Sequence, residues 1–235
     1  MEKLLLIVPA YNEEESIAET ISMLRKQPYD FVIVNDGSTD KTVSIAQKFG
    51  VHVIDLPFNQ GLFGAFLTGM HYAKLHGYSY AMQFDADGQH LPQYIEPMLK
   101  HMEQTGCNIV IGSRFLEAPM PFTLRMFGSS LIRIMLKLTI GQTLTDPTSG
   151  MRMYDRHMIE LFTKRTDLTP EPDTIAYLMR NGISVKEVAV TMQERVAGTS
   201  YLSSFTAVKY MGRMALSILL IQFVREKICM GEMRE

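Results

Sequence analysis

Short apolar runs alternate with longer amphipathic segments over residues 1–112. The apolar runs are rich in β-branched residues and end in Gly, Pro, Asn or Asp, which is the pattern of buried strands. We expect five such strands, at residues 4–8, 31–35, 51–55, 80–84 and 108–111. The segments between them have helical periodicity. Strands that alternate with helices predict an α/β fold, with a mostly parallel sheet covered on both faces.

The helix after the first strand has a start signal of its own. Asn12 is followed three residues later by Glu15, which is the spacing of a capping box. We therefore expect this helix to begin at Asn12 and to reach about Lys26. Three more helices are expected, one ending near Phe49, one ending near Gly77 and one opening at Pro92.

The second half of the chain has a different pattern. We expect a polar turn and a short strand over residues 145–154, a helix over 173–181 and a strand over 183–190. No repeat or low-complexity linker interrupts it. The economical division is one domain over residues 1–202, followed by a basic amphipathic helical extension over residues 203–235.

Two segments of this half, residues 121–140 and 205–228, are basic and amphipathic. Their cationic side chains are Arg125, Arg133, Lys137, Lys209 and Arg213. The apolar faces either pack on the sheet or on a second subunit, as in a homodimer, or lie in a membrane surface with the cations near anionic head groups. No window of the sequence reaches the roughly 18 apolar residues that a spanning helix needs.

Composition narrows the class of protein. A hydrophobic content of 46% and a charged content of 20% are typical of a globular protein. The net charge of -2 argues against a dedicated nucleic-acid binder. Cys107 and Cys229 lie far apart with no metal-ligand spacing, so we expect free thiols in a reducing cytoplasm.

The strand expected at residues 80–84 ends in two carboxylates, Asp85 and Asp87. Residues i and i+2 of an extended segment point to the same side, so these carboxylates converge. Two carboxylates this close repel each other unless a hard divalent cation, Mg²⁺ or Mn²⁺, lies between them. The alternative interpretation of this segment is a solvated Asp-Gly turn without a cation. Tyr11 and Asp36 end two other strands at the edge where such sheets bind ligands. We therefore predict a site assembled from several loops.

Several motifs together resemble a known family. Four N-terminal segments look like those of family-2 glycosyltransferases of the GT-A fold: Pro9–Glu14, Asn35–Asp40, Asn59–Gly69 and Phe84–His90. Three later segments are similar to the dolichol-phosphate mannosyltransferase branch, whose members load a sugar onto a polyprenyl phosphate: Gly112–Phe115, Asp146–Arg152 and Glu194–Ser200. The resemblance covers about residues 3–202.

The resemblance implies an inverting glycosyltransferase with a nucleotide-sugar donor, which we expect to be a UDP-sugar. The nucleotide-binding residues would be Pro9, Ala10, Tyr11, Glu13, Asp36, Gly61 and Asp85. Asp85 and Asp87, with Gln89, would hold the divalent cation bound to the diphosphate, and Asp87 is a catalytic candidate. Such a cation stabilises the departing nucleoside diphosphate as a Lewis acid.

The acceptor implied is polyprenyl phosphate at the cytoplasmic face of the cell membrane, for surface-glycan or cell-wall assembly. A phosphate is already an anion and needs cationic guides. The candidates are Arg114, Arg152, Arg195 and Ser200. Tyr201 departs from the branch, which usually has lysine at this place, and acceptor binding there is expected to differ.

Two other functions stay open. The acceptor is alternatively a hydroxyl of a growing glycan, which requires a general base, and the candidates are Asp173 and Asp146. Asp173 precedes a predicted helix and has an equally plain interpretation as its N-cap. The non-enzymatic alternative is a nucleotide-sugar-binding scaffold without turnover.

Overall fold

The computed structural model describes residues 3–118, 124–193, 210 and 212–220. Its centre is a seven-stranded sheet in the order β3-β2-β1-β4-β6-β5-β7. The strands are β1 (Leu4–Ala10), β2 (Asp30–Asn35), β3 (Val53–Asp55), β4 (Tyr80–Gln83), β5 (Ile109–Ser113), β6 (Arg152–Asp155) and β7 (Val185–Ala189). Only β6 among them runs antiparallel to its neighbours, β4 and β5. The predicted α/β fold with a mostly parallel sheet is confirmed.

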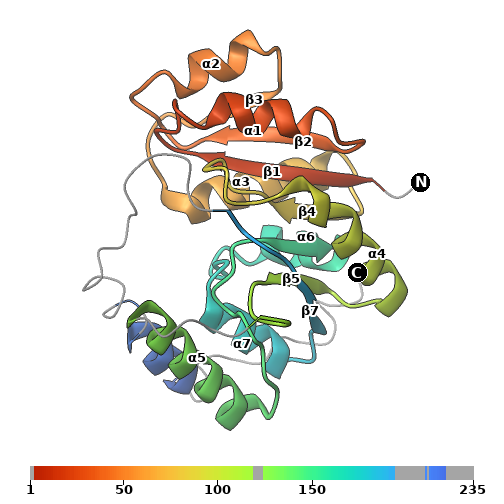
Figure 1. Ribbon diagram of the computed structural model, residues 1–235, viewed down its shortest axis with the longest axis vertical. Helices are drawn as coiled ribbons and strands as arrows, with labels where there is room; N and C mark the ends of the chain where they lie inside the picture. Colours follow the sequence, from red (N-terminus) through yellow and green to blue (C-terminus); the bar gives the residue numbers. More distant parts are fainter. Residues whose placement is uncertain (1–2, 119–123, 194–209, 211, 221–235) are drawn as a thin grey trace.

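Helices cover both faces of this sheet (Figure 1). They are α1 (Ile17–Leu24), α2 (Thr42–Lys48), α3 (Gly61–Leu75), α4 (Ile95–Thr105), α5 (Leu124–Ile140), α6 (Arg156–Lys164) and α7 (Pro172–Arg180), with a 3-10 turn η1 (Pro92–Tyr94) before α4. Residues of α3, α5, α6 and α7 share one apolar cluster, and residues of α1, α2 and α4 share the other. The sheet therefore has a separate core on each side.

The alternation of side chains along β1 explains why its sequence is apolar throughout. Leu4, Leu6 and Val8 belong to one core cluster, whereas Leu5 and Ile7 belong to the other. Full burial of each such side chain stabilises the fold by roughly 1.5–3 kcal/mol. An uninterrupted apolar run is the signature of a central strand with both faces covered.

One glycine of the resemblance motifs has a packing role. A Cβ added at Gly69 of α3 would lie 2.2 Å from Cγ2 of Ile7 on β1. Only a residue without a side chain lets the helix come so close to the strand. This contact seats α3 directly under the strand that leads to the predicted site.

The first helix begins later than the capping-box prediction. α1 starts at Ile17 with Ser16 as its N-cap residue. Asn12 takes a left-handed conformation with φ of 54°, and its Oδ1 accepts a hydrogen bond from the Thr39 backbone N–H at 2.9 Å. The prediction of a helix start at Asn12 was wrong because this long-range contact replaces the local cap.

The second half contains one helix that the sequence pattern did not reveal. α6 opens at Asp155, whose side chain accepts a hydrogen bond from the Met158 backbone N–H at 2.8 Å. The strand and helix expected further along are present as β7 and α7, within a few residues of the predicted bounds.

The two amphipathic segments meet in space (Figure 1). α5 covers most of the first, and residues 212–220 of the second are helical. Met214 and Ile218 belong to the same core cluster as Ile132 and Leu136 of α5. Apart from Tyr210, the rest of the second segment lies outside the described residues, as does the predicted boundary between residues 202 and 203. Within the described ranges, no helix combines the length and the apolarity needed to cross a bilayer.

Candidate active site

Three neighbouring parallel strands, β2, β1 and β4, end at one edge of the sheet, and each is followed by a predicted site residue. Ala10 at the end of β1 pairs in register with Asn35 of β2. The Asp36 backbone N–H then donates to the Ala10 carbonyl at 2.9 Å. On the other side of β1, Asp85 follows β4 closely. The predicted assembly of residues from several loops at the carboxyl edge is therefore present.

The loops after β1 and β2 are joined to each other by hydrogen bonds. The Asn12 backbone N–H donates to Ser38 Oγ at 2.9 Å, and the Thr39 backbone N–H returns a bond to Asn12 Oδ1 at 2.9 Å. The Glu13 backbone N–H donates to Thr42 Oγ1 at 2.8 Å. These bonds hold Tyr11 and Glu13, two of the expected nucleotide-binding residues, without any ligand.

Asp36 is buried, and its carboxylate organises a third loop. Its Oδ1 accepts a hydrogen bond from the Gln60 backbone N–H at 2.7 Å. Gly37 has φ of 68°, and a Cβ added to it would lie 2.7 Å from the Asn59 backbone nitrogen. Gly61, which opens α3, donates its N–H to Asn59 Oδ1 at 3.0 Å. Asp36 and Gly37 thus join the loop before α3 to the loop after β2.

Asp85 is a partly exposed carboxylate, with a side-chain exposure of 31%. Gln83 Nε2 donates to its Oδ1 at 2.9 Å. The buried His90 accepts the Asp85 backbone N–H on Nδ1 at 2.9 Å, so its ring proton is on Nε2, which lies 3.4 Å from Asp85 Oδ2. Both groups orient the carboxylate. The sequence marked the region but did not identify Gln83 as part of the site.

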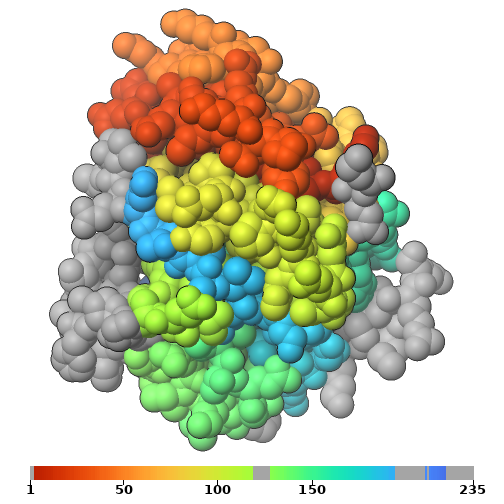
Figure 2. Space-filling view, turned by 45° about the vertical axis from the view of Figure 1, so that its right-hand side comes forward, coloured from red at the N-terminus to blue at the C-terminus, as the bar shows by residue number. Residues whose placement is uncertain are grey.

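Asp87 is 5% exposed, and its Oδ1 accepts the Gln89 backbone N–H at 3.0 Å. Gln89 also exchanges hydrogen bonds with the segment that follows β7. Its carbonyl accepts the Gln193 N–H at 3.0 Å, and its Nε2 lies 3.4 Å from the Gln193 carbonyl. Figure 2 shows this blue segment packed against the yellow chain after β4. The carboxylate loop is therefore supported from the second half of the chain.

This pair of carboxylates fits a cation that is shared with a ligand. The described residues contain no group of three or more His, Cys, Asp or Glu side chains able to hold a metal ion. Mg²⁺ and similar ions are commonly held by one or two carboxylates, with phosphate oxygens and water completing the coordination. Asp85 and Asp87 supply such a pair of oxygen ligands, and Gln89 lies beside them.

The loop over residues 145–150 reaches the carboxylates from the other half of the sheet. A Cβ added at Gly150 would lie 2.9 Å from Asp85 Oδ2. The absence of a side chain at Gly150 therefore leaves room for the carboxylate. The Asp146–Arg152 motif contains this glycine, but sequence reasoning assigned it no role.

Asp146 is fully buried, with an exposure of 0%. Arg114 Nε donates to its Oδ2 at 2.6 Å, and Arg114 Nη2 donates to its Oδ1 at 2.9 Å. Thr148 Oγ1 adds a bond to Oδ1 at 3.1 Å. Two charge-assisted bonds hold this carboxylate away from solvent, which favours a supporting role for Asp146 over that of a general base; the base role stays a prediction.

Arg152 is also enclosed, with an exposure of 2%. Its guanidinium donates to three backbone carbonyls: those of Ser149 at 2.8 Å, Pro147 at 2.8 Å and Pro170 at 2.7 Å. These bonds and the low exposure favour a supporting role for Arg152, and its predicted role as a ligand of an acceptor phosphate stays a prediction. It joins the loop over residues 145–150 to the chain before α7.

Asp173 is the second residue of α7, and the N-cap position belongs to Glu171. Asp173 Oδ1 accepts the Thr174 backbone N–H at 2.8 Å, and Oδ2 accepts Ser217 Oγ–H at 2.6 Å. The N-cap interpretation of Asp173 was therefore wrong. Tyr210 donates its hydroxyl to Glu171, and burial raises the pKa of the Glu171 carboxyl above its usual value. Arg195 and Ser200 lie outside the described residues.

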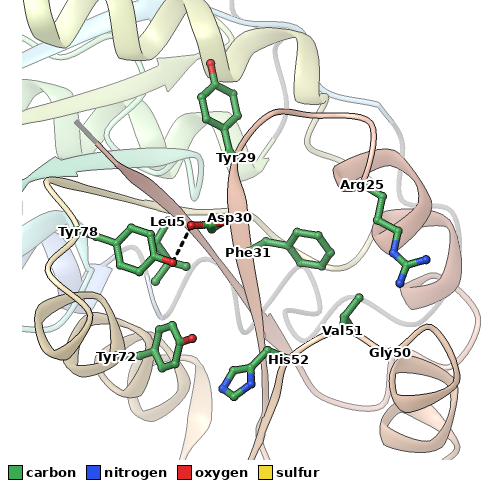
Figure 3. Close-up of a pocket in the computed structure, with 10 residues that line it drawn as sticks. All are labelled: Leu5, Arg25, Tyr29, Asp30, Phe31, Gly50, Val51, His52, Tyr72 and Tyr78. Carbon is green, nitrogen blue, oxygen red and sulfur yellow. Dashed lines mark hydrogen bonds between the residues drawn. The ribbon is translucent and has the colours of Figure 1, made fainter. Parts of the chain in front are cut away.

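A recess of about 410 Å³ lies at the opposite, amino-terminal edge of β1 and β2 (Figure 3). Its lining includes Tyr72, His52 and the Tyr78 hydroxyl, which donates to Asp30 at 2.9 Å. Burial and this bond raise the pKa of Tyr78. None of the predicted site residues within the described ranges lines this recess, so it is separate from the carboxylate edge.

Comparisons with known proteins agree with this geometry. Residues 5–162 match Glycosyl transferase family 2. The chain is 31% identical, over 86% of its length and 88% of the relative's, to undecaprenyl-phosphate mannosyltransferase of Micrococcus luteus. It is 29% identical, over 85% of its length and 91% of the relative's, to UDP-N-acetylglucosamine–dolichyl-phosphate N-acetylglucosaminyltransferase of Methanococcus voltae.

The fold has a close counterpart among solved structures. Glucosyl-3-phosphoglycerate synthase of Mycobacterium tuberculosis, solved with Mn²⁺, UDP and phosphoglyceric acid, aligns with a TM-score of 0.63 at 18% identity, over 94% of this chain and 78% of that one. The family match spans most of the chain, and the two relatives carry the names of enzymes of the predicted branch. The chain is a glycosyltransferase of the GT-A fold and belongs to glycosyl transferase family 2.

Proposed function

We propose that this enzyme transfers a sugar from a UDP-sugar to a polyprenyl phosphate, with inversion at the anomeric carbon and with the help of Mg²⁺ or Mn²⁺. The observation that carries the proposal is the pair Asp85 and Asp87, held at the end of β4 beside the joined loops of β1 and β2. The M. voltae relative is named for a UDP-sugar, and the M. tuberculosis structure holds UDP and Mn²⁺, so both support the donor and the second supports the cation.

On the donor side, each group has a task that follows from its position. Tyr11, Glu13 and Asp36 surround the space where the nucleotide would bind, and the loop that opens α3 at Gly61 closes it. Asp85, Asp87 and Gln89 would hold the cation, which stabilises the leaving diphosphate as a Lewis acid when bound. The buried His90 and Gln83 keep the Asp85 carboxylate aimed at this point.

On the acceptor side, the state of the carboxylates favours a phosphate over a hydroxyl. Both oxygens of Asp146 are bound to Arg114, and both oxygens of Asp173 accept hydrogen bonds. A phosphate acceptor needs no base, since it is already an anion. Arg114, with a side-chain exposure of 30%, is the predicted phosphate ligand that still reaches the surface within the described residues.

The acceptor chemistry suggests where the enzyme works. Exposed apolar side chains cover α5 and residues 212–220: they are Ile134, Leu138, Leu216, Leu219 and Leu220. Arg133, Lys137 and Arg213 are on the same two helices, which carry no acidic residue over residues 124–140 and 212–220. We propose that this surface lies on the cytoplasmic face of the cell membrane, where anionic lipids attract cations, and that the product serves surface-glycan assembly. A homodimer is the competing occupant.

The test separates donor, cation and acceptor. Melting temperatures are measured with UDP, GDP and nucleotide sugars in Mg²⁺, Mn²⁺ or EDTA, because a ligand that binds the native state raises the melting temperature. We expect a cation-dependent rise with UDP, which is lost in Asp87→Asn and kept in the matched surface variant Asp167→Asn. Incubation with polyprenyl phosphate then identifies the glycolipid. No shift with any nucleotide refutes the donor site.

The rival hydroxyl acceptor is tested separately with Asp173→Asn. If Asp173 were a general base, this variant would lose most of its turnover and its dependence on pH. We expect transfer to polyprenyl phosphate to continue at a rate within a few-fold of wild type. Transfer to a glycan hydroxyl that depends on Asp173 would overturn the phosphate acceptor.

A further inference from the structure

Glu187 on β7 has unusually many partners for a residue that no motif singled out. Its Oε2 accepts the Thr145 backbone N–H at 2.7 Å. Its Oε1 accepts the Thr145 hydroxyl at 2.9 Å and the Asp146 backbone N–H at 2.8 Å. All of these donors belong to one short stretch of the loop over residues 145–150. One carboxylate therefore determines where the backbone of Asp146 lies.

Asp146, in the same stretch, binds the Arg114 guanidinium through its carboxylate. Asp146 is buried and takes Arg114 through Nε and Nη2, which form one edge of the planar fork. Arg114 is partly exposed, whereas its partner is not. The side of the guanidinium away from Asp146 is therefore the side that faces the surface.

The strand that leads into Arg114 is attached at the same place. Ser113 Oγ and Thr145 Oγ1 are 2.5 Å apart. Ser113 ends β5, which pairs with β7 in a register that sets Ile111 beside Glu187. Both residues of the Arg114–Asp146 pair are thus connected to β7. Asp146 binds Glu187 through its backbone N–H, and the chain before Arg114 contacts Thr145, which also binds Glu187.

We propose that Glu187 is a positioning residue: through Thr145 and Asp146 it holds the Arg114 guanidinium in the orientation that binds the acceptor phosphate. This inference rests on the proposed function. A long arginine side chain loses rotamer freedom when it binds a ligand, and holding it beforehand lowers that cost. The Asp146 carboxylate occupies one edge of the fork, and the remaining donors fit a phosphate oxygen.

Two substitutions of Glu187 differ in how much of this arrangement survives. Glu187→Ala removes every acceptor for the loop. Glu187→Gln keeps one carbonyl oxygen for the Oε1 contacts but sets an amide donor against the Thr145 N–H. Glu103, which is exposed on α4, provides matched Ala and Gln controls. Melting temperatures are compared first, so that all constants come from folded protein.

The readouts are the KM values for a short-chain polyprenyl phosphate and for the donor. We expect Glu187→Ala to raise the acceptor KM about tenfold, as for the loss of one or two well-placed hydrogen bonds, and Glu187→Gln to raise it less. In both Glu187 variants, the donor KM and the nucleotide-induced melting shift should stay within about twofold of wild type. In both Glu103 variants, the acceptor KM should also stay within about twofold of wild type.

A double-mutant cycle with Arg114→Ala decides whether Glu187 acts through that residue. We expect Glu187→Ala to add nothing to the acceptor KM once Arg114 is gone. Additive effects, or an equal rise in the donor KM, would overturn the inference and leave the proposed function standing. If wild-type protein neither binds nor glycosylates polyprenyl phosphate, both the acceptor assignment and this inference fall together.

Discussion

The proposed donor side and the proposed acceptor side of this enzyme contain charged residues with different surroundings. On the donor side, Asp85 is partly exposed and is oriented by a neutral amide and an imidazole. On the acceptor side, Asp146 and Arg152 are buried, and their polar atoms are directed at other parts of the protein. A charged residue in a motif therefore has two possible tasks, ligand binding or support. Burial alone does not distinguish them, because the proposed cation ligand Asp87 is itself only 5% exposed, so the partners of the polar atoms have to be compared as well.

The largest effect is expected from a substitution that removes a carboxylate on the proposed donor side. Asp87→Asn keeps the side-chain shape and the Gln89 contact but removes a negative ligand from the cation. We expect turnover to fall by about 10²–10³-fold, as for the loss of one group that stabilises transition-state charge, with unfolding free energy nearly unchanged. Initial rates and urea unfolding measure the two quantities. Asp167→Asn removes an exposed ion pair with Arg165 and should leave turnover unaltered, with a loss of unfolding free energy below about 1 kcal/mol.

A substitution of Arg152 tests the other side of the comparison. Arg152→Ala leaves three carbonyls without their donor, so we expect the free energy of unfolding to fall by about 3 kcal/mol or more. Urea unfolding measures it, with the exposed Arg180→Ala as the control. If Arg152 instead bound the acceptor, the free energy of unfolding of Arg152→Ala would equal that of wild type and only the acceptor KM would rise.

Gly150→Ala tests the point where the two sides meet. The added methyl group would lie 2.9 Å from Asp85 Oδ2 and would push the carboxylate from its position. We expect the cation concentration for half-maximal activity to rise about tenfold. A Mn²⁺ titration of activity measures it. Gly212→Ala, where a Cβ meets nothing within 4 Å, is the control and should titrate like wild type.

The exposed apolar surface of α5 and residues 212–220 makes a weaker prediction. Leu138 is 72% exposed, and we expect Leu138→Ser to weaken binding to vesicles with anionic lipids by about tenfold or less. Co-sedimentation measures binding. Leu75→Ser, 81% exposed on α3, should bind as wild type does. If neither variant alters vesicle binding but Leu138→Ser breaks a dimer, the surface belongs to a second copy.

The smallest expected effect concerns the pH dependence of stability. Burial raises the pKa of Glu171, so the folded state holds this proton more tightly than the unfolded state. Its stabilising contribution is present below the unfolded pKa and is lost as pH rises through the folded pKa. Glu171→Gln should therefore gain stability relative to wild type as pH rises above the usual carboxyl pKa of 4.5, by about 1 kcal/mol. Chemical unfolding at several pH values measures it, and a parallel pH dependence of both proteins would contradict it.

Strand and motif placement on the donor side followed from the sequence. Residues 4–8, 31–35 and 80–84 are short, mostly apolar runs that are bounded by Pro, Asn or Asp, and this pattern indicates buried strands. The carboxylates after β4 lie within a few residues of the strand that carries them. Short-range patterns of this kind survive folding, because local geometry determines which way the side chains point.

Tertiary contacts decided the rest of the arrangement, on both sides of the proposed site. Asn12 left its predicted helix because Thr39 binds it, and β6 inserts antiparallel between β4 and β5. Arg114 reaches Asp146, and Glu187 reaches Thr145, across 32 and 42 residues of sequence. The sequence by itself determined the strands, the carboxylate edge and the family. Only the tertiary structure determined which charged residues bind each other, because the partner of a long side chain depends on contacts between segments that no local pattern relates.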